Sequence, residues 1–65
     1  MELIINGTAE KGDFSTVLAL LEARGHAPKA VVVEINGEIV PAAEFVGRAL
    51  ADGDTVEIVQ FVGGG

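Results

Sequence analysis

Very few side chains in this 65-residue sequence are suited to catalysis. It contains no cysteine, and so it offers no thiolate nucleophile, no thiolate metal site and no disulfide. The single histidine, His26, has no acidic residue near it in the sequence, which favours a surface histidine over a general base or a metal ligand. Ser15 is expected to cap a helix. Because no nucleophile can be paired with a base, we do not expect an enzyme.

Two further patterns resemble ligand sites but lack necessary residues. The segment from Gly7 to Gly12 has the glycine spacing of a phosphate-binding loop, but no lysine follows it. Asp52, Asp54 and Glu57 lack the spacing of a calcium loop, and Asp-Gly-Asp is an ordinary turn sequence. We therefore expect no bound metal and no bound cofactor.

The sequence ends in three glycines, Gly63, Gly64 and Gly65, directly after a predicted strand. Glycine adds nothing to a core and costs the most entropy to order, so these residues do not serve stability. Without Cβ atoms they allow an extended backbone to pass through a narrow channel into another protein's active site. The carboxylate of Gly65 is then the candidate reactive group, positioned for ATP-dependent adenylation, and Gly63 and Gly64 are the residues that thread the channel.

The charge is strongly acidic, with ten Asp and Glu against four Lys and Arg, for a net charge of −6. Residues 34–65 hold six of the acids and only one base, Arg48, which suits a basic partner surface. An acidic chain is unlike a nucleic-acid-binding protein, and its apolar runs are shorter than the roughly 20 residues of a membrane span. We expect a cytoplasmic protein with one domain, residues 1–62, and a flexible glycine tail, residues 63–65.

The first half of the chain predicts a hairpin followed by a helix. A strand at 2–6 ends in Asn6-Gly7, the dipeptide of tight hairpin turns, and a polar strand at 8–11 returns as a sheet edge. A helix is expected at about 16–24, with Gly25 at its C-terminal end. Its apolar residues follow the helical spacing: Val17, Leu18, Leu20 and Leu21.

The second half predicts a second hairpin, a connector and a last strand. The three strands are expected at 30–36, 38–40 and 55–62. A second Asn-Gly pair, Asn36-Gly37, joins the first two of them. In the connector, 42–50, we expect Phe45, Val46 and Leu50 to form one helical turn on the core.

This order of elements predicts an α+β fold. A lone helix between two hairpins can bury its apolar stripe only against one face of their sheet. The last strand then pairs in parallel with the first one, because the long crossover leaves that position open. The result is a β-grasp, ubiquitin-like arrangement with a mixed sheet of about five strands packed on one helix.

The last strand is apolar on both of its faces. Alternation places Val56, Ile58 and Val62 on one side and Val59 and Phe61 on the other. One side packs on the helix. The other side has two interpretations, which the sequence leaves open. In the first, Val59 and Phe61 form an exposed patch for a partner, joined by Ile4 of the neighbouring strand and continued by Val62 toward the tail. In the second, the connector around Phe45 covers them.

Several motifs together resemble the thiamine-biosynthesis sulfur carrier family, ThiS. They span nearly the whole chain and include Ile5-Asn-Gly7, Val33-Glu-Ile-Asn-Gly-Glu-Ile-Val-Pro41, Leu50-Ala-Asp-Gly-Asp-Thr-Val-Glu-Ile-Val59 and Val62-Gly-Gly-Gly65. Members often have an arginine after the proline and a tryptophan a few residues later, where this chain has Ala42 and Phe45.

The resemblance implies a protein co-substrate. An E1-like adenylyltransferase (ThiF-like) would use ATP and magnesium to adenylate the Gly65 carboxylate, and a sulfur donor such as a cysteine desulfurase would convert it to a thiocarboxylate. Thiazole synthase (ThiG-like) would then take the sulfur. The alternatives are the small subunit of molybdopterin synthase, which shares the fold and the Gly-Gly end, and a ubiquitin-like protein modifier.

Overall fold

The computed structural model describes residues 1–61 and contains a five-stranded mixed sheet with one α-helix. The strands are β1 (Glu2–Ile5), β2 (Thr8–Lys11), β3 (Val31–Ile35), β4 (Glu38–Val40) and β5 (Thr55–Gln60). The helix is α1 (Val17–Ala23), and two 3-10 turns, η1 (Pro28–Ala30) and η2 (Ala42–Glu44), lie in the connections.

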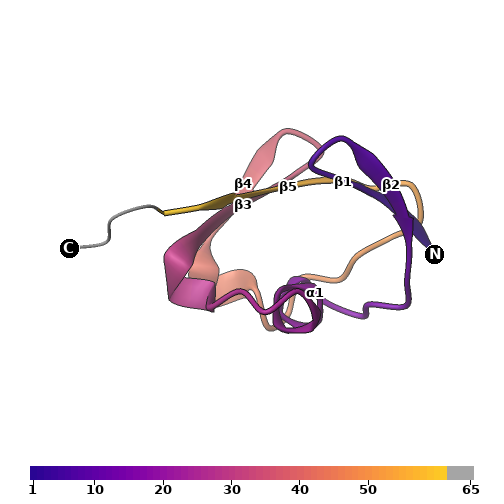
Figure 1. Cartoon of the computed structure of the whole chain (residues 1–65). Helices are drawn as coiled ribbons and strands as arrows, with labels where there is room; N and C mark the ends of the chain where they lie inside the picture. Colours follow the sequence, from indigo (N-terminus) through magenta and orange to yellow (C-terminus); the bar gives the residue numbers. More distant parts are fainter. Residues whose placement is uncertain (62–65) are drawn as a thin grey trace.

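The strand order is β2-β1-β5-β3-β4, with β1 and β5 parallel and the other neighbours antiparallel. The last strand therefore pairs beside the first one, and β2 lies at an edge, as the sequence predicted. Figure 1 shows α1 beneath one face of this sheet and no element over the other face. The β-grasp prediction is confirmed.

Both hairpins turn at the predicted Asn-Gly pairs. Asn6 and Asn36 have φ values of 50° and 52°, and the glycines after them have φ values of 84° and 86°. Two consecutive residues with positive φ match the twist of the flanking strands, and asparagine and glycine adopt this conformation at the lowest cost. Local sequence thus sets the register of both hairpins.

The start of α1 differs from the prediction by one residue. Thr16, and not Ser15, is the N-cap: its side-chain oxygen accepts a hydrogen bond from Ala19 N at 3.2 Å. Thr16 forms an isolated antiparallel bridge with Ala49. That bridge holds Thr16 in the extended conformation that an N-cap needs, so the helix begins after it.

The connector completes this cap. The first two helical amides, Val17 N and Leu18 N, donate to the carbonyls of Arg48 and Phe45, each at 3.0 Å. Amides at a helix start have no partner within the helix. The connector therefore supplies the partners that the helix itself lacks.

The end of α1 agrees with the prediction. Gly25 has a φ of 76°, its N donates to Glu22 O at 3.1 Å, and His26 N donates to Leu21 O at 2.9 Å. This pair of hydrogen bonds is the Schellman motif, which requires a left-handed residue where Gly25 stands.

One hydrophobic core lies between the sheet and α1. Every strand but β2 contributes to it, and no charged or polar residue among those described is buried. The buried residues are Leu3, Ile5, Val17, Leu20, Leu21, Val31, Val33, Ile35, Val40, Phe45, Leu50, Val56 and Ile58.

The connector forms the predicted short helical turn, as η2 continued by hydrogen bonds from Gly47 N and Arg48 N to Glu44 O. Phe45 and Leu50 enter the core as predicted, whereas Val46 remains 68% exposed. The prediction that Val46 packs on the core is therefore wrong. A single tight turn directs successive side chains to different sides, so Phe45 points inward while its neighbour Val46 faces solvent.

Candidate functional site

The candidate site is the end of the sheet where β5 finishes, at the side of the molecule opposite the N-terminus (Figure 1). Phe61 follows the last residue of β5, and its N still donates to Ala30 O at 2.7 Å. The backbone is thus held to β3 up to the last described residue. The predicted tail residues Val62, Gly63, Gly64 and Gly65 lie outside the described residues.

The face of the sheet away from α1, called here the open face, carries Val59 and Phe61. Their exposed fractions are 57% and 55%. Phe45, which was the alternative cover for them, is only 2% exposed and belongs to the core on the other side of the sheet. The interpretation in which the connector covers Val59 and Phe61 is wrong.

The neighbours of Val59 and Phe61 on the open face come from β3 and from the residue before it. Val59 is directly opposite Val32, which is half-buried, and Phe61 lies beside Ala30 through its backbone hydrogen bond. We call Val32, Val59 and Phe61 the apolar patch. Val32 was missed in the sequence, although the alternation of β3 around the buried Val31 and Val33 would have placed it outward.

Ile4 does not join the apolar patch. It lies on the same face and is 39% exposed, but its partner on β5 is Thr55. Thr55 precedes Val59 by four residues, about 13 Å along a strand. The parallel register of β1 against β5 causes this separation, and sequence periodicity does not report register.

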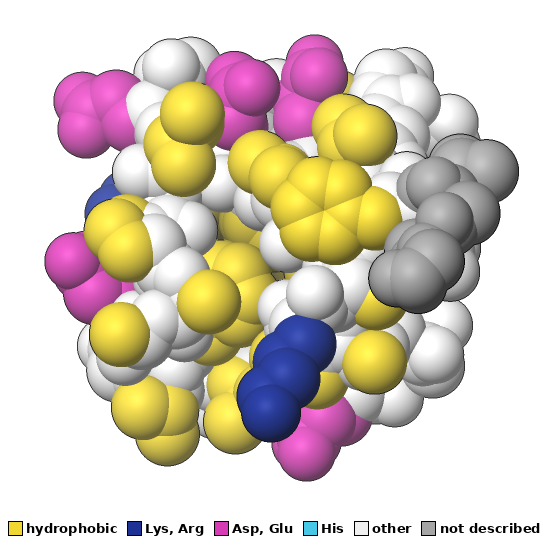
Figure 2. All heavy atoms as spheres, turned by 90° about the vertical axis from the view of Figure 1, so that its left-hand side faces the viewer, with side chains coloured by type: hydrophobic (Ala, Val, Ile, Leu, Met, Phe, Trp, Pro, Cys, Tyr) yellow, Lys and Arg dark blue, Asp and Glu magenta, His cyan; other side chains and the backbone are white. Residues whose placement is uncertain are grey.

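Figure 2 views the molecule from the end where β5 finishes. Hydrophobic side chains gather across this end, and acidic side chains lie along the upper edge as well as at the left and the bottom, where Lys and Arg side chains are also visible. Exposed apolar surface of this kind, rimmed by polar groups, is typical of a protein interface.

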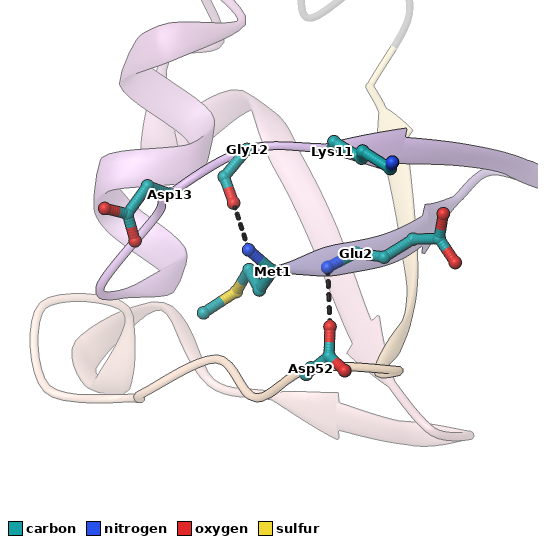
Figure 3. A pocket seen from close by; sticks show the side chains of 6 residues that line it. All are labelled: Met1, Glu2, Lys11, Gly12, Asp13 and Asp52. Carbon is teal, nitrogen blue, oxygen red and sulfur yellow. Dashed lines mark hydrogen bonds between the residues drawn. The ribbon is translucent and has the colours of Figure 1, made fainter.

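The opposite end of the molecule contains a hollow lined by polar and charged residues, drawn in Figure 3. Its groups mainly fasten the start of β1: the ammonium group of Met1 donates to Gly12 O at 3.0 Å, and Glu2 N donates to Asp52 Oδ1 at 2.6 Å. The hollow is lined by Met1, Glu2, Lys11, Gly12, Asp13 and Asp52. It lies far from the end of β5 and contains no cysteine, serine or histidine.

Asp54, the second aspartate of the predicted turn, also makes hydrogen bonds that stabilise the turn. Asp54 accepts hydrogen bonds from Ala51 N at 2.9 Å and from Asn36 Nδ2 at 3.0 Å, and Gly53 has a φ of 87°. Within residues 1–61, no group of three or more His, Cys, Asp or Glu is arranged to hold a metal ion. Asp52 and Asp54 thus act as turn residues.

None of the helices in the described part of the chain is long and apolar enough to cross a membrane. These features define the class of protein: a small β-grasp domain with an exposed apolar patch beside the end of its last strand.

Comparison with known proteins identifies the group within this class. A family model described as "ThiS family" matches residues 3–65. The chain is 42% identical, over 85% of its length and 83% of the relative's, to the sulfur carrier protein ThiS of Bacillus subtilis. The crystal structure of a thiamine biosynthesis protein (ThiS) from Geobacter metallireducens superposes with a TM-score of 0.84 at 38% identity, covering 100% of both chains. The chain belongs to the ThiS family.

A second kind of relative is much longer. The chain is 48% identical over its whole length to part of a thiazole synthase from Paramagnetospirillum magneticum and 35% identical to part of one from Magnetococcus marinus. It spans only 20% of the length of each of these two proteins.

Proposed function

We propose that this chain carries sulfur as a thiocarboxylate on Gly65, the last residue of the printed sequence. In the first step, a carboxylate oxygen attacks the α-phosphorus of ATP on an E1-like adenylyltransferase with magnesium, and pyrophosphate leaves. Sulfur from a donor such as a cysteine desulfurase then attacks the carbonyl carbon, and AMP leaves with the bonding electrons. Where the donor is a persulfide, a thiol supplies the two electrons that release the thiocarboxylate.

In this cycle the chain is a co-substrate, and the catalytic groups belong to its partners. The chain's own contribution is to present its C-terminal residues to the active site of the partner. Gly63 and Gly64 thread the partner's channel, and Val59, Phe61 and Val62 form the surface on which the partner docks. The hydrogen bond from Phe61 N to Ala30 O supports this role, because it fixes the start of the tail on the sheet.

The observation that carries the proposal is the match to the ThiS family over residues 3–65, which includes the terminal glycines. Thiazole synthase is the proposed acceptor of the sulfur, and the two long relatives with that name support it, because they contain a segment of this kind. The cycle needs ATP and a thiol reductant, and the cytoplasm is the compartment that fits it.

The test is the intact mass of the protein after incubation with an E1-like adenylyltransferase, ATP, magnesium and a sulfur donor. We expect a shift that corresponds to replacement of one carboxylate oxygen by sulfur. An unchanged mass with all cognate enzymes would contradict the proposal, and isopeptide-linked adducts would show a protein modifier instead.

The matched control is a chain that lacks Gly64 and Gly65. We expect it to unfold at the same denaturant concentration as the full chain but to undergo no mass shift. Loss of folding in this shortened chain would show that the glycines serve the fold.

A further inference from the structure

The open face carries a pair of acidic residues next to the apolar patch. Glu34 of β3 and Glu57 of β5 are directly opposite each other in the antiparallel register, and Ile39 of β4 flanks Glu34 on its other side. Cβ atoms of directly opposite residues are about 5 Å apart. Val32 and Val59 form the next pair on this face toward the tail, about 7 Å along the strands. We call Glu34 and Glu57 the acidic pair.

Like charges in opposite positions of a sheet destabilise it. Within residues 1–61 the ion pair is Arg24 with Glu10, at 3.0 Å, and it lies on the helix side of the sheet. The cation of the open face is Lys11 on the edge strand β2, where it is opposite Glu2. Just after β1, Asn6 lies beside this part of β5: its N donates to Val56 O at 2.9 Å, and its Oδ1 accepts a hydrogen bond from Ile58 N at 2.8 Å. Within the described part of the chain, neither Glu34 nor Glu57 therefore forms an ion pair.

We infer that the open face docks on a protein surface that combines a hollow for the apolar patch with an arginine or lysine placed between Glu34 and Glu57. The inference deepens the proposed function, on which it rests. It commits to the sulfur acceptor, thiazole synthase, as the occupant, because two long relatives with that name contain a segment of this kind. An arginine suits the position best, because its planar guanidinium can donate to two carboxylates while its flat surface covers adjacent apolar groups.

The acidic pair gives the docking a direction that an apolar patch alone does not. Apolar contact is non-directional, whereas a charge contact about 7 Å from Val59 fixes the rotation of the carrier on the partner. Rotation matters here, because it determines where the end of β5 points. Complementary charge also accelerates association and makes its rate dependent on salt.

The test compares two double variants that each remove two negative charges from the net charge of −6. Glu34→Gln with Glu57→Gln removes the acidic pair. Glu22→Gln with Glu38→Gln is the matched control, since both residues are exposed, one on α1 and the other opposite Ile35, on the helix side of the sheet. Association with purified thiazole synthase is measured at low and at high salt, together with the urea midpoint of each variant.

We expect the acidic-pair variant to associate about tenfold more slowly at low salt, with a weaker dependence on salt, and the control to remain within about threefold of the wild type. The urea midpoint of the acidic-pair variant should equal or exceed that of the wild type, because a like-charge contact is removed. Equal slowing in both variants would mean that only the net charge matters, and it would overturn the inference. Unchanged association, a lowered midpoint in the acidic-pair variant, or a wild type that does not bind would also overturn it.

The mass assay separates this inference from the proposed function. If the wild type forms a thiocarboxylate while the acidic-pair variant binds as the control does, the docking inference alone fails. If the wild type forms no thiocarboxylate with its activating enzyme, the proposed function fails.

Discussion

The two faces of the sheet are made from the same strands but differ in burial and in the types of side chain that they carry. The face toward α1 carries the buried hydrophobic core, with Val56 and Ile58 of β5 in its centre. The open face alternates with it residue by residue, and there β5 presents Glu57, Val59 and Phe61 to solvent. Burial of the first face stabilises the domain, whereas exposure of large apolar groups on the second contributes little to folding. The first face therefore stabilises the fold, and the second is the face that we propose binds a partner.

The largest effect on the free energy of unfolding is expected at Phe45, the connector residue that packs in the core. Phe45→Ala should lower the free energy of unfolding by about 3–5 kcal/mol, because it empties a core position. Val46→Ala, at the adjacent exposed position, should change it by less than about 0.5 kcal/mol. Urea denaturation followed by circular dichroism measures both. Similar losses in the two variants would show that the connector does not separate its two residues as described.

A matched pair within β5 compares the two faces directly. Val56→Ala removes buried methyl groups and should cost about 2 kcal/mol, whereas Val59→Ala on the open face should cost less than about 0.5 kcal/mol. The same denaturation experiment applies to both. If Val59→Ala costs as much as Val56→Ala, the open face is covered in solution and the comparison between faces is broken.

A smaller loss of stability is expected when the N-cap of α1, on the helix side of the sheet, is removed. Thr16→Ala removes the oxygen that accepts from Ala19 N and should cost about 1 kcal/mol. Thr55→Ala, an exposed position on the open face, is the control and should stay within about 0.5 kcal/mol. Thermal unfolding of Ser15→Ala should resemble the wild type, and a loss as large as that of Thr16→Ala would move the cap back to Ser15.

The smallest effect on stability, with a large effect on binding, is expected for Phe61→Asp. Its free energy of unfolding should fall by less than about 1 kcal/mol, while its affinity for thiazole synthase should fall about 30-fold, as for an aromatic anchor of an interface. Ala9→Asp adds the same charge to the open face on β2, and it should bind nearly as well as the wild type. A stability loss of roughly 3 kcal/mol in Phe61→Asp would place Phe61 in the core.

Much of the fold was predictable because its signals are local. The Asn-Gly turns, the helix with Gly25 after it and the alternation of β5 depend on residues next to each other in the chain. Even the parallel pairing of β1 with β5 followed from the element order and the rules of connection. The misassigned cap had a different cause: Ser15 and Thr16 are both good N-caps, and a bridge to the distant Ala49 decides between them.

The sequence by itself determined which side chains are available for chemistry: it has no cysteine and one histidine, His26. Its three terminal glycines led to the prediction that the carboxylate of Gly65 is the reactive group. Only the tertiary structure decided which apolar residues lie together. It buried Phe45, left Val46 and Phe61 exposed, moved Ile4 away from Val59 and brought Glu34 opposite Glu57. The physical reason is that side-chain types and local periodicity are properties of short segments, whereas register between strands is fixed by contacts across the whole chain.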